Sequence, residues 1–203
     1  MAVFDYLTLT LARGPAARAG FVKAIAASGL SDGGKAVGLF TPQLGWEAAR
    51  AALLVERGGD RVGAAEALKA LSRAPEVKSC AFHELAATIR PGPGAALKAG
   101  GVYVHRWFEV ETAAFDEFIA LSAEAWPDFE SRFDARIFGL FDLTSGRAGD
   151  PPGRRHLLLV TRYASHGVWE DSRDPSTAAM QTFARRAMLT LSTTGASTLL
   201  TLP

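Results

Sequence analysis

The same order of predicted elements occurs twice along this chain: strand, helix, strand, strand, helix, strand. A segment rich in glycine and proline, PGPGAALKAGG (residues 91–101), separates the two copies and is typical of a linker. Each copy predicts a four-stranded antiparallel sheet that carries both of its helices on one face. Repetition at about 100 residues therefore predicts two ferredoxin-like β-α-β-β-α-β units, residues 1–95 and residues 96–203.

Alternating apolar and polar residues predict the strands, and apolar residues at helical spacing predict the helices. In the first unit the strands are expected at 3–11, 35–41, 46–57 and 77–90, and the helices at 15–28 and 61–72. Segment 46–57 is rich in residues that favour helices, and only the repeated order makes it a strand. In the second unit the strands are expected at 102–110, 135–143, 156–163 and 196–202, and the helices at 112–133 and 166–189, the latter broken near Asp174-Pro175.

One face of each sheet would remain uncovered by helices. Exposed apolar faces and unpaired strand edges are unfavourable in a monomer, so the two uncovered faces are expected to pack together and close an α+β barrel. The sequence leaves two possibilities open. One chain closes its own barrel, or two chains close it across a homodimer.

Composition and charge exclude several classes of protein. The formal net charge of +1 is far from the basic excess of nucleic-acid-binding proteins. Cys80 is the only cysteine, which excludes an intrachain disulfide and a thiolate metal cluster. No apolar run approaches the ~20 residues of a membrane span, and the first residues alternate like a strand rather than a signal peptide. A soluble, cytoplasmic bacterial protein is therefore expected.

Three segments of the second unit stand out: YVHRWFEV (103–110), FDEFIALSAEAWPDFE (115–130) and LLLVTRYASHGVWEDSR (157–173). They resemble the NIPSNAP family of the dimeric α/β-barrel superfamily. The resemblance covers about half of the chain, since the first unit matches only in the order of its elements. It implies tandem ferredoxin-like repeats in a dimeric-type α/β barrel, and a homodimer, but no settled reaction.

Two arginines lie on otherwise apolar strand faces. Arg106 shares its face with Val104 and Phe108, and Arg162 shares its face with Val160. A buried guanidinium needs a carboxylate or an anionic ligand. We therefore hypothesise a two-arginine clamp that binds the acidic group of a small molecule. The alternative is that both arginines pair with acids of the same unit, such as Glu124, Glu130 or Glu170.

The resemblance implies a ligand site between the helices and the sheet, because several enzymes of the superfamily bind ligands there. Trp126, Phe129 and Phe133 would form the roof of such a pocket. The alternative is that these aromatic residues are plain core. Tyr163 and His105 are the titratable residues closest to the clamp in sequence.

His105 lies on the strand face that is directed toward the other unit, together with Tyr103 and Trp107. It is interpreted either as interface packing or as a general base or haem ligand. No spacing among the four histidines, at positions 83, 105, 156 and 166, predicts a zinc site. No cofactor or metal is therefore expected.

Three functions remain open. The first is a small-molecule binder whose aromatic pocket lies in the second unit and takes a small organic, possibly anionic, compound. The second is a cofactor-independent oxygenase or isomerase, an enzyme class that works without a sequence motif. The third is a scaffold or interaction protein without a ligand.

Overall fold

The computed structural model describes residues 2–147 and 149–202. The strands are β1 (Val3–Leu11), β2 (Gly34–Leu44), β3 (Arg50–Arg57), β4 (Val77–Ala87), β5 (Val102–Glu111), β6 (Ala135–Leu143), β7 (Arg154–Tyr163) and β8 (Thr190–Leu202). The helices are α1 (Pro15–Ala27), α2 (Leu30–Gly33), α3 (Arg61–Ser72), α4 (Phe115–Arg132), α5 (His166–Asp171) and α6 (Ala178–Ala187), with a 3-10 turn at Thr112–Ala114 before α4. No described helix is both long and apolar enough to cross a membrane.

All eight strands form one closed antiparallel barrel, in the order β1-β3-β2-β8-β5-β7-β6-β4. The order within the first half, β4-β1-β3-β2, is matched in the second half by β8-β5-β7-β6. The halves meet at two seams, where β2 pairs with β8 and β4 pairs with β6. The barrel therefore closes within a single chain, which is one of the two possibilities that the sequence left open.

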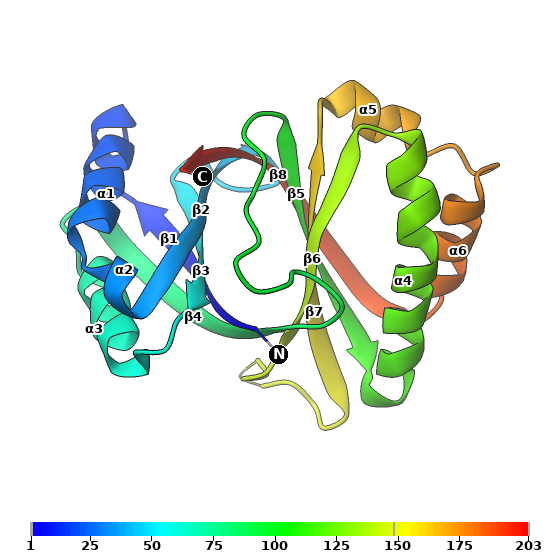
Figure 1. Ribbon diagram of the computed structural model, residues 1–203, viewed down its shortest axis with the longest axis horizontal. Helices are drawn as coiled ribbons and strands as arrows, with labels where there is room; N and C mark the ends of the chain where they lie inside the picture. Colours follow the sequence, from blue (N-terminus) through cyan, green and yellow to red (C-terminus); the bar gives the residue numbers. More distant parts are fainter. Residues whose placement is uncertain (1, 148, 203) are drawn as a thin grey trace.

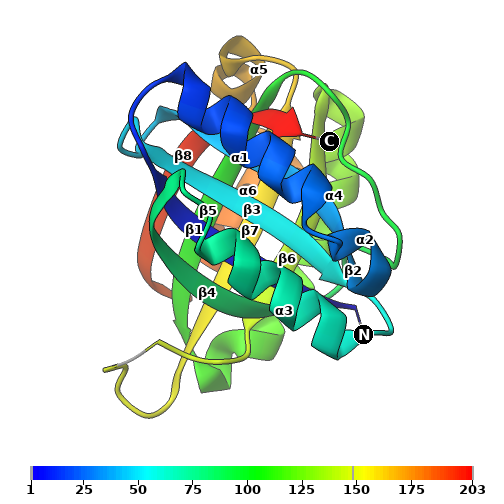
Figure 2. The same ribbon diagram turned by 90° about the vertical axis from the view of Figure 1, so that its left-hand side faces the viewer.

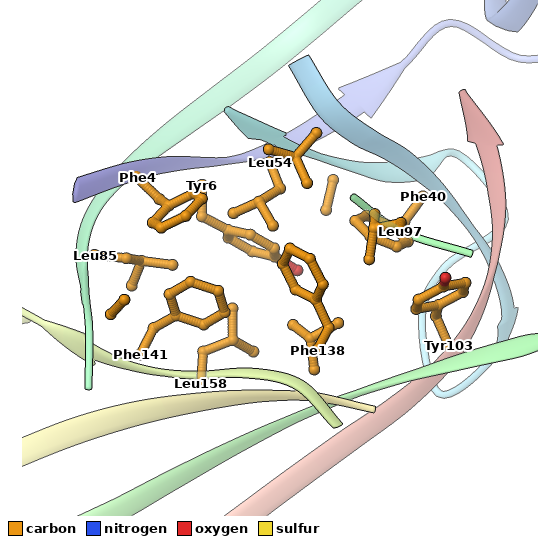
Figure 3. Close-up of a cluster of buried hydrophobic side chains, with 14 of the residues drawn as sticks. Phe4, Tyr6, Phe40, Leu54, Leu85, Leu97, Tyr103, Phe138, Phe141 and Leu158 are labelled. Atoms are coloured by element: carbon orange, nitrogen blue, oxygen red, sulfur yellow. The ribbon is translucent and has the colours of Figure 1, made fainter. Parts of the chain in front are cut away.

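The helices cover the outside of the barrel in two layers (Figures 1 and 2). Helices α1, α2 and α3 cover the sheet of the first half, and α4, α5 and α6 lie beside the sheet of the second half. Three apolar cores result: one inside the barrel and one beneath each helical layer. Aromatic and aliphatic side chains from both halves fill the barrel interior (Figure 3).

Alternation within β1 explains how one strand serves two cores. Phe4 and Tyr6 point into the barrel, whereas Leu7, Leu9 and Leu11 pack under the helices of the first half. Successive side chains of a strand project to opposite faces, so a strand between two cores is buried on both. Strands β6 and β7 are likewise buried along most of their length.

The linker between the halves is part of the barrel core. Leu97 packs among the interior side chains (Figure 3). The hydroxyl of Tyr103 donates a hydrogen bond to the carbonyl oxygen of Lys98 at 2.6 Å, and the backbone N–H of Gly94 donates to the carboxylate of Glu56. The segment that the sequence identifies only as a linker thus covers one end of the barrel.

Several element boundaries differ from the prediction. Residues 46–49 lie in the loop between β2 and β3, and not in a strand that starts at residue 46. Strand β8 begins at Thr190, six residues before the predicted start, because it pairs with β5 along most of its length. The helical segment 166–189 is divided into α5 and α6, which confirms the break expected near Asp174-Pro175.

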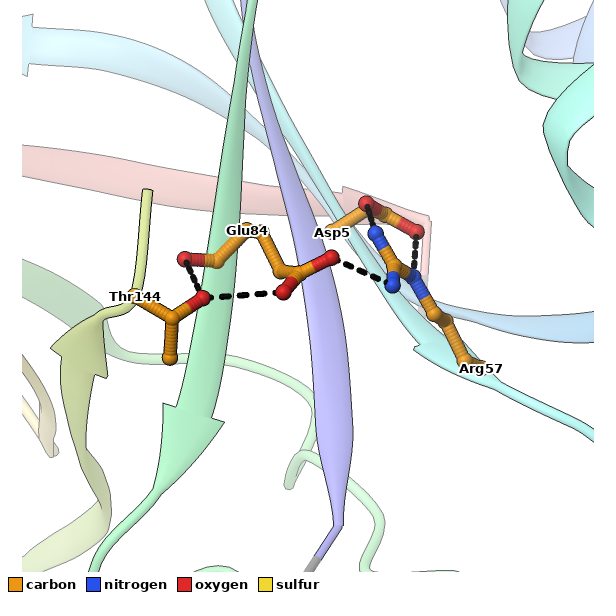
Figure 4. A network of polar contacts seen from close by, with 4 residues as sticks. All are labelled: Asp5, Arg57, Glu84 and Thr144. Atoms are coloured by element: carbon orange, nitrogen blue, oxygen red, sulfur yellow. Dashed lines mark hydrogen bonds and ion pairs between the residues drawn. The ribbon is translucent and has the colours of Figure 1, made fainter. Parts of the chain in front are cut away.

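A polar network crosses the sheet of the first half and reaches the seam with the second half (Figure 4). Arg57 donates two hydrogen bonds to the carboxylate of Asp5, at 2.7 and 2.6 Å, and a third to Glu84 at 2.6 Å. The hydroxyl of Thr144, which follows β6, donates to Glu84 at 2.9 Å. The side chain of Asp5 is only 8% exposed, so the guanidinium of Arg57 compensates a buried negative charge.

Replacement of Arg57 by methionine should therefore lower the free energy of unfolding by about 3 kcal/mol, because the carboxylate of Asp5 would remain buried without a cation. Urea denaturation measures this change. Arg132→Met is the matched control: Arg132 pairs with Asp128 on the surface of α4 and should cost less than about 0.5 kcal/mol. Equal costs for the two variants would contradict a structural role for the network.

Candidate functional site

A cavity of about 270 Å³ lies between α6 and the helix-covered face of β5 and β7. We call it the three-arginine cavity, after Arg106, Arg173 and Arg186, which line it together. The other side chains used below are Phe108, Phe129, Thr161, Tyr163, Met180 and Phe183. The cavity thus combines apolar walls with three cationic groups.

Arg106 projects from the middle of β5 into this layer, on the same face as Phe108 and Val110. Its guanidinium makes no hydrogen bond and no ion pair within the described chain. Burial lowers the pKa of Arg106, and the neighbouring charge of Arg173 lowers it further. Tyr163 acts in the opposite direction and raises the pKa, but burial remains the largest effect. The charged form of Arg106 is therefore held at a cost that no hydrogen bond or ion pair of the described chain offsets.

Arg186 lies on the buried face of α6 and is only 5% exposed. Its guanidinium donates a hydrogen bond to the hydroxyl of Ser122 at 3.1 Å. Its central carbon lies 4.6 to 5.1 Å from the ring centroids of Phe108, Phe118 and Phe183. These contacts are cation–π interactions, but burial, followed by the charges of Arg106 and Arg173, still lowers the pKa of Arg186 to about 9.

Arg173 connects the segment between α5 and α6 to the sheet. It donates a hydrogen bond to the hydroxyl of Tyr163 at 3.1 Å and another to the carbonyl oxygen of Trp169 at 3.4 Å. Its guanidinium also lies over the ring of Trp169. Arg173 therefore fixes Tyr163 at one wall of the cavity.

No aspartate or glutamate lines the three-arginine cavity in the described part of the chain. The nearby acids of α4 are engaged elsewhere. Glu124 accepts hydrogen bonds from Thr182 and Arg185, and Asp128 accepts one from Arg132. Glu130 accepts hydrogen bonds from Arg90 and Arg136. The cavity therefore concentrates positive charge within an apolar layer, an arrangement that favours a bound anion.

The structure brings together three of the six residues that the sequence singled out, namely Arg106, Phe129 and Tyr163. The ring of Phe129 packs edge to face on Tyr163, with centroids 6.1 Å apart. The other three residues, Arg162, Trp126 and His105, do not line this cavity.

The hypothesised two-arginine clamp, in which Arg106 and Arg162 would bind the same ligand, is wrong. Strand β5 pairs with β7 so that Arg106 lies opposite Leu159 and Arg162 lies opposite Tyr103. Opposed residues of an antiparallel pair project from the same face. Leu159 lies under the helices and Tyr103 lies inside the barrel, so the two arginines point to opposite faces.

Arg162 instead has a structural set of partners. It donates hydrogen bonds to the carbonyl oxygen of Gly100 and to the carboxylate of Asp134, both at 3.1 Å. It thereby joins the linker to the turn before β6. Arg162 therefore fits the alternative interpretation, in which each arginine pairs with an acid of the same half. The acid is Asp134, which is not one of those expected.

Trp126 is fully buried in the core between α4 and the sheet, with the guanidinium of Arg90 5.2 Å from its ring centroid. Phe133, the third expected roof residue, packs at the edge of the same core. The predicted aromatic roof is therefore formed in part by Phe129 and by Phe183 of α6, a residue that was not among the candidates.

His105 points into the barrel, as its strand face predicts. Its Nδ1 lies 2.9 Å from the hydroxyl of Tyr6, a residue of the first half, and its Nε2 has no hydrogen-bond partner within the described chain. Burial lowers the pKa of His105 to about 3, so the imidazole is neutral at pH 7.

Sequence reasoning missed Arg173 and Arg186. Arg185 and Arg186 together look like a short solvated basic stretch. The signal that separates them is helical spacing: Ala179, Thr182 and Arg186 recur on one face of α6 and are all buried. Arg185 lies off that face and is exposed to solvent.

The buried histidine generates a prediction about acid stability. As the pH falls below about 6.5, the unfolded chain protonates His105, whereas the folded chain does not until about pH 3. The free energy of unfolding should therefore decrease as the pH is lowered. Between pH 7 and pH 5 this decrease should be about 2 kcal/mol smaller in His105→Phe than in the wild type. Urea titrations at both pH values measure the difference. Equal slopes for the wild type and His105→Phe would contradict the assignment.

No model of a protein family and no curated protein matches the sequence. Solved structures do match the fold. An anthrone oxidase-like protein superposes with a TM-score of 0.63 and 12% identity, over 99% of this chain and 92% of the other. A candidate monooxygenase from Fusobacterium nucleatum gives 0.63 and 10%, over 98% and 92%. A heme-binding protein from Thermus thermophilus gives 0.53 and 12%, over 98% and 92%. The chain has the dimeric α/β-barrel fold of these proteins.

Proposed function

We propose that this protein binds a small organic anion in the three-arginine cavity. The observation that carries the proposal is the uncompensated charge of Arg106, which reaches into an apolar layer without a protein partner. Natural proteins rarely keep such a group unless a ligand pairs with it. A bound carboxylate or phenolate would restore the pKa of Arg106 and Arg186 toward ordinary values.

The walls of the cavity define the rest of the ligand. Phe129 and Phe183 lie with ring centroids 5.6 Å apart, and Met180 lies beside them. These side chains suit a planar apolar body. The hydroxyls of Thr161 and Tyr163 offer further hydrogen bonds along one wall. The favoured ligand is therefore an aromatic or unsaturated compound with one acidic group.

The NIPSNAP relation belongs to this proposal. The three segments that carry the resemblance, 103–110, 115–130 and 157–173, contribute Arg106, Phe129, Tyr163 and Arg173 to the cavity. We further propose that residues 1–95 and 96–203 are copies of one ferredoxin-like unit, since both halves have the same strand order. Homodimerisation through another surface is a separate prediction that light scattering tests.

Haem does not fit this cavity. Haem iron takes an axial histidine, cysteine, methionine or tyrosine. The lining contains no histidine or cysteine in the described chain, and the hydroxyl of Tyr163 already accepts a hydrogen bond from Arg173. Methionine ligates haem iron together with a histidine, and Met180 has no histidine beside it in the described lining. His105, the alternative ligand, lies inside the barrel, on the opposite face of β5 from this cavity. The ligand of the three-arginine cavity is therefore proposed to be an organic anion and not haem.

A second candidate function is a cofactor-independent oxygenase acting on such an anion. Two of the similar folds belong to an anthrone oxidase-like protein and to a candidate monooxygenase. Guanidinium groups in an apolar layer would stabilise an enolate or phenolate of the substrate, which is the form that such an enzyme must generate. The wild type should consume oxygen in the presence of phenolic acids or anthrones, and Arg106→Met should not. If none of these compounds causes oxygen uptake, the oxygenase proposal is wrong and only the binding proposal remains.

Binding is tested by thermal and chemical denaturation against a panel of one- and two-ring aromatic carboxylates and phenols. A ligand at about 100 times its Kd should stabilise the wild type by about 2.7 kcal/mol. Arg106→Met should lose most of this effect. Without ligand, the same variant should be at least as stable as the wild type, because a half-buried cation without a hydrogen-bond partner is removed.

Arg13→Met is the matched control, because Arg13 is exposed and lies outside the cavity. It should change neither the stability nor the response to ligands. If no compound stabilises the wild type, and Arg106→Met is strongly destabilised, Arg106 is a structural residue and the scaffold interpretation holds.

A further inference from the structure

A second cavity opens at the end of the barrel interior away from the linker. Its volume is about 380 Å³, and we call it the barrel-mouth pocket. The side chains that define it are Thr8, Trp46, Arg50, His83, His105 and Trp107. Trp107 lies four residues along β5 from Tyr103, which bonds to the linker, on the same interior face. The pocket is therefore separate from the linker-covered end.

Two tryptophans form walls of the pocket, and an arginine lies over each of them. The guanidinium of Arg50 lies 5.2 Å from the ring centroid of Trp46, and that of Arg147 lies 5.1 Å from the ring centroid of Trp107. Neither guanidinium forms an ion pair with an acid in the described chain. The acid beside Arg147 is Asp150, whose carboxylate accepts the backbone N–H of Arg147 and is also engaged by His156 at 2.7 Å. Stacking on an indole leaves the N–H edge of a guanidinium free to bind a carboxylate.

The position of Trp46 depends on a tight contact between its loop and β8. Gly45, directly before it, has a φ of +85°, and a Cβ there would lie 2.8 Å from the carbonyl oxygen of Gly195. Only glycine fits both requirements without strain. Trp46 is thereby held over His105, with ring centroids 5.3 Å apart.

His105 supplies an unused polar atom to this pocket. If the hydroxyl of Tyr6 donates to Nδ1, one group, the Nε2–H, remains without a partner. In the other tautomer, both the Tyr6 hydroxyl hydrogen and the Nε2 lone pair would be unsatisfied. The count of satisfied groups therefore favours an Nε2–H donor, which suits an anion.

The remaining polar groups carry no negative charge. Burial, together with Arg147 and Arg50, lowers the pKa of His83, whose Nε2 lies 3.1 Å from the hydroxyl of Thr8. The nearest acid on the same face of β5 is Glu109, two residues beyond Trp107. It is engaged by Ser192 and Arg154. The pocket is thus cationic, aromatic and rich in hydrogen-bond donors.

We propose that the barrel-mouth pocket is a second ligand site that binds a small aromatic carboxylate. The aromatic ring stacks between Trp46 and Trp107, and the carboxylate pairs with Arg50 and Arg147. This site lies on the opposite face of β5 from Arg106, because residues 105 and 107 project into the barrel and residue 106 projects toward the helices. It does not depend on the three-arginine cavity.

Benzoate is the probe, and the four tryptophan indole N–H signals in a ¹⁵N-labelled protein are the readout. Trp46 and Trp107 report on the barrel-mouth pocket, Trp169 lies beside Arg106, and Trp126 lies in the core. Trp→Phe variants assign the signals. Benzoate should shift the signals of Trp46 and Trp107, and benzamide, its neutral counterpart, should bind about tenfold more weakly.

Arg50→Gln and Arg147→Gln should each weaken benzoate binding at this site by about tenfold. Both residues are exposed, so the variants are expected to fold. The exposed Arg13→Gln and the helix-side Arg106→Gln should leave the shifts of Trp46 and Trp107 unchanged.

Three outcomes would overturn the proposal. The first is a response confined to Trp169 and abolished by Arg106→Gln, which assigns benzoate to the three-arginine cavity. The second is equal binding of benzoate and benzamide, which removes the role of the arginines. The third is binding of inorganic phosphate, but not of benzoate, with the same dependence on Arg50 and Arg147, which removes the role of the aromatic walls.

Discussion

Closure of the barrel is the constraint on which the rest of this structure depends. Each half has helices on only one face of its sheet, and the other face is apolar. Packing the two uncovered faces together buries Phe4, Phe40, Phe138 and Phe141 in one shared core. Pairing at both seams also removes the free strand edges. Burial of apolar area supplies the driving force, and the seams specify how the halves align.

The barrel gives β5 two different environments. Its even-numbered side chains from Val104 to Val110 lie under the helices, and its odd-numbered side chains from Tyr103 to Trp107 lie inside the barrel. Both faces are partly dry, so polar groups on either face are costly unless something pairs with them. Arg106 on one face and His105 on the other are such groups, one residue apart. A single strand thereby contributes to two cavities that do not communicate through it.

The two cavities share a charge pattern, although they are built differently. In the three-arginine cavity, burial lowers the pKa of the half-buried Arg106 and of the buried Arg186, and the walls are apolar. The barrel-mouth pocket has exposed arginines stacked on tryptophans above neutral histidines. In both cavities, the lining arginines form no ion pair with an acid of the described chain. A ligand that brings a carboxylate complements either arrangement.

The sequence by itself determined the order of the eight strands and the main helices, because periodicity is largely a local property. The repeated order was needed to identify segment 46–57 as a strand, and the short helix α2 was not predicted. The sequence also made Arg106, Phe129 and Tyr163 candidates: Arg106 as a cation on an apolar strand face, Phe129 as part of an aromatic helix stripe, and Tyr163 as a titratable neighbour. Only the tertiary structure decided that Arg106 and Arg162 point to opposite sides. Alternation determines which residues of one strand share a face. The register between β5 and β7 determines which residues of the two strands lie on the same face of the sheet, and a shift of one residue would place Arg106 and Arg162 on the same face. The contact between Tyr6 of the first half and His105 of the second likewise required the closed barrel.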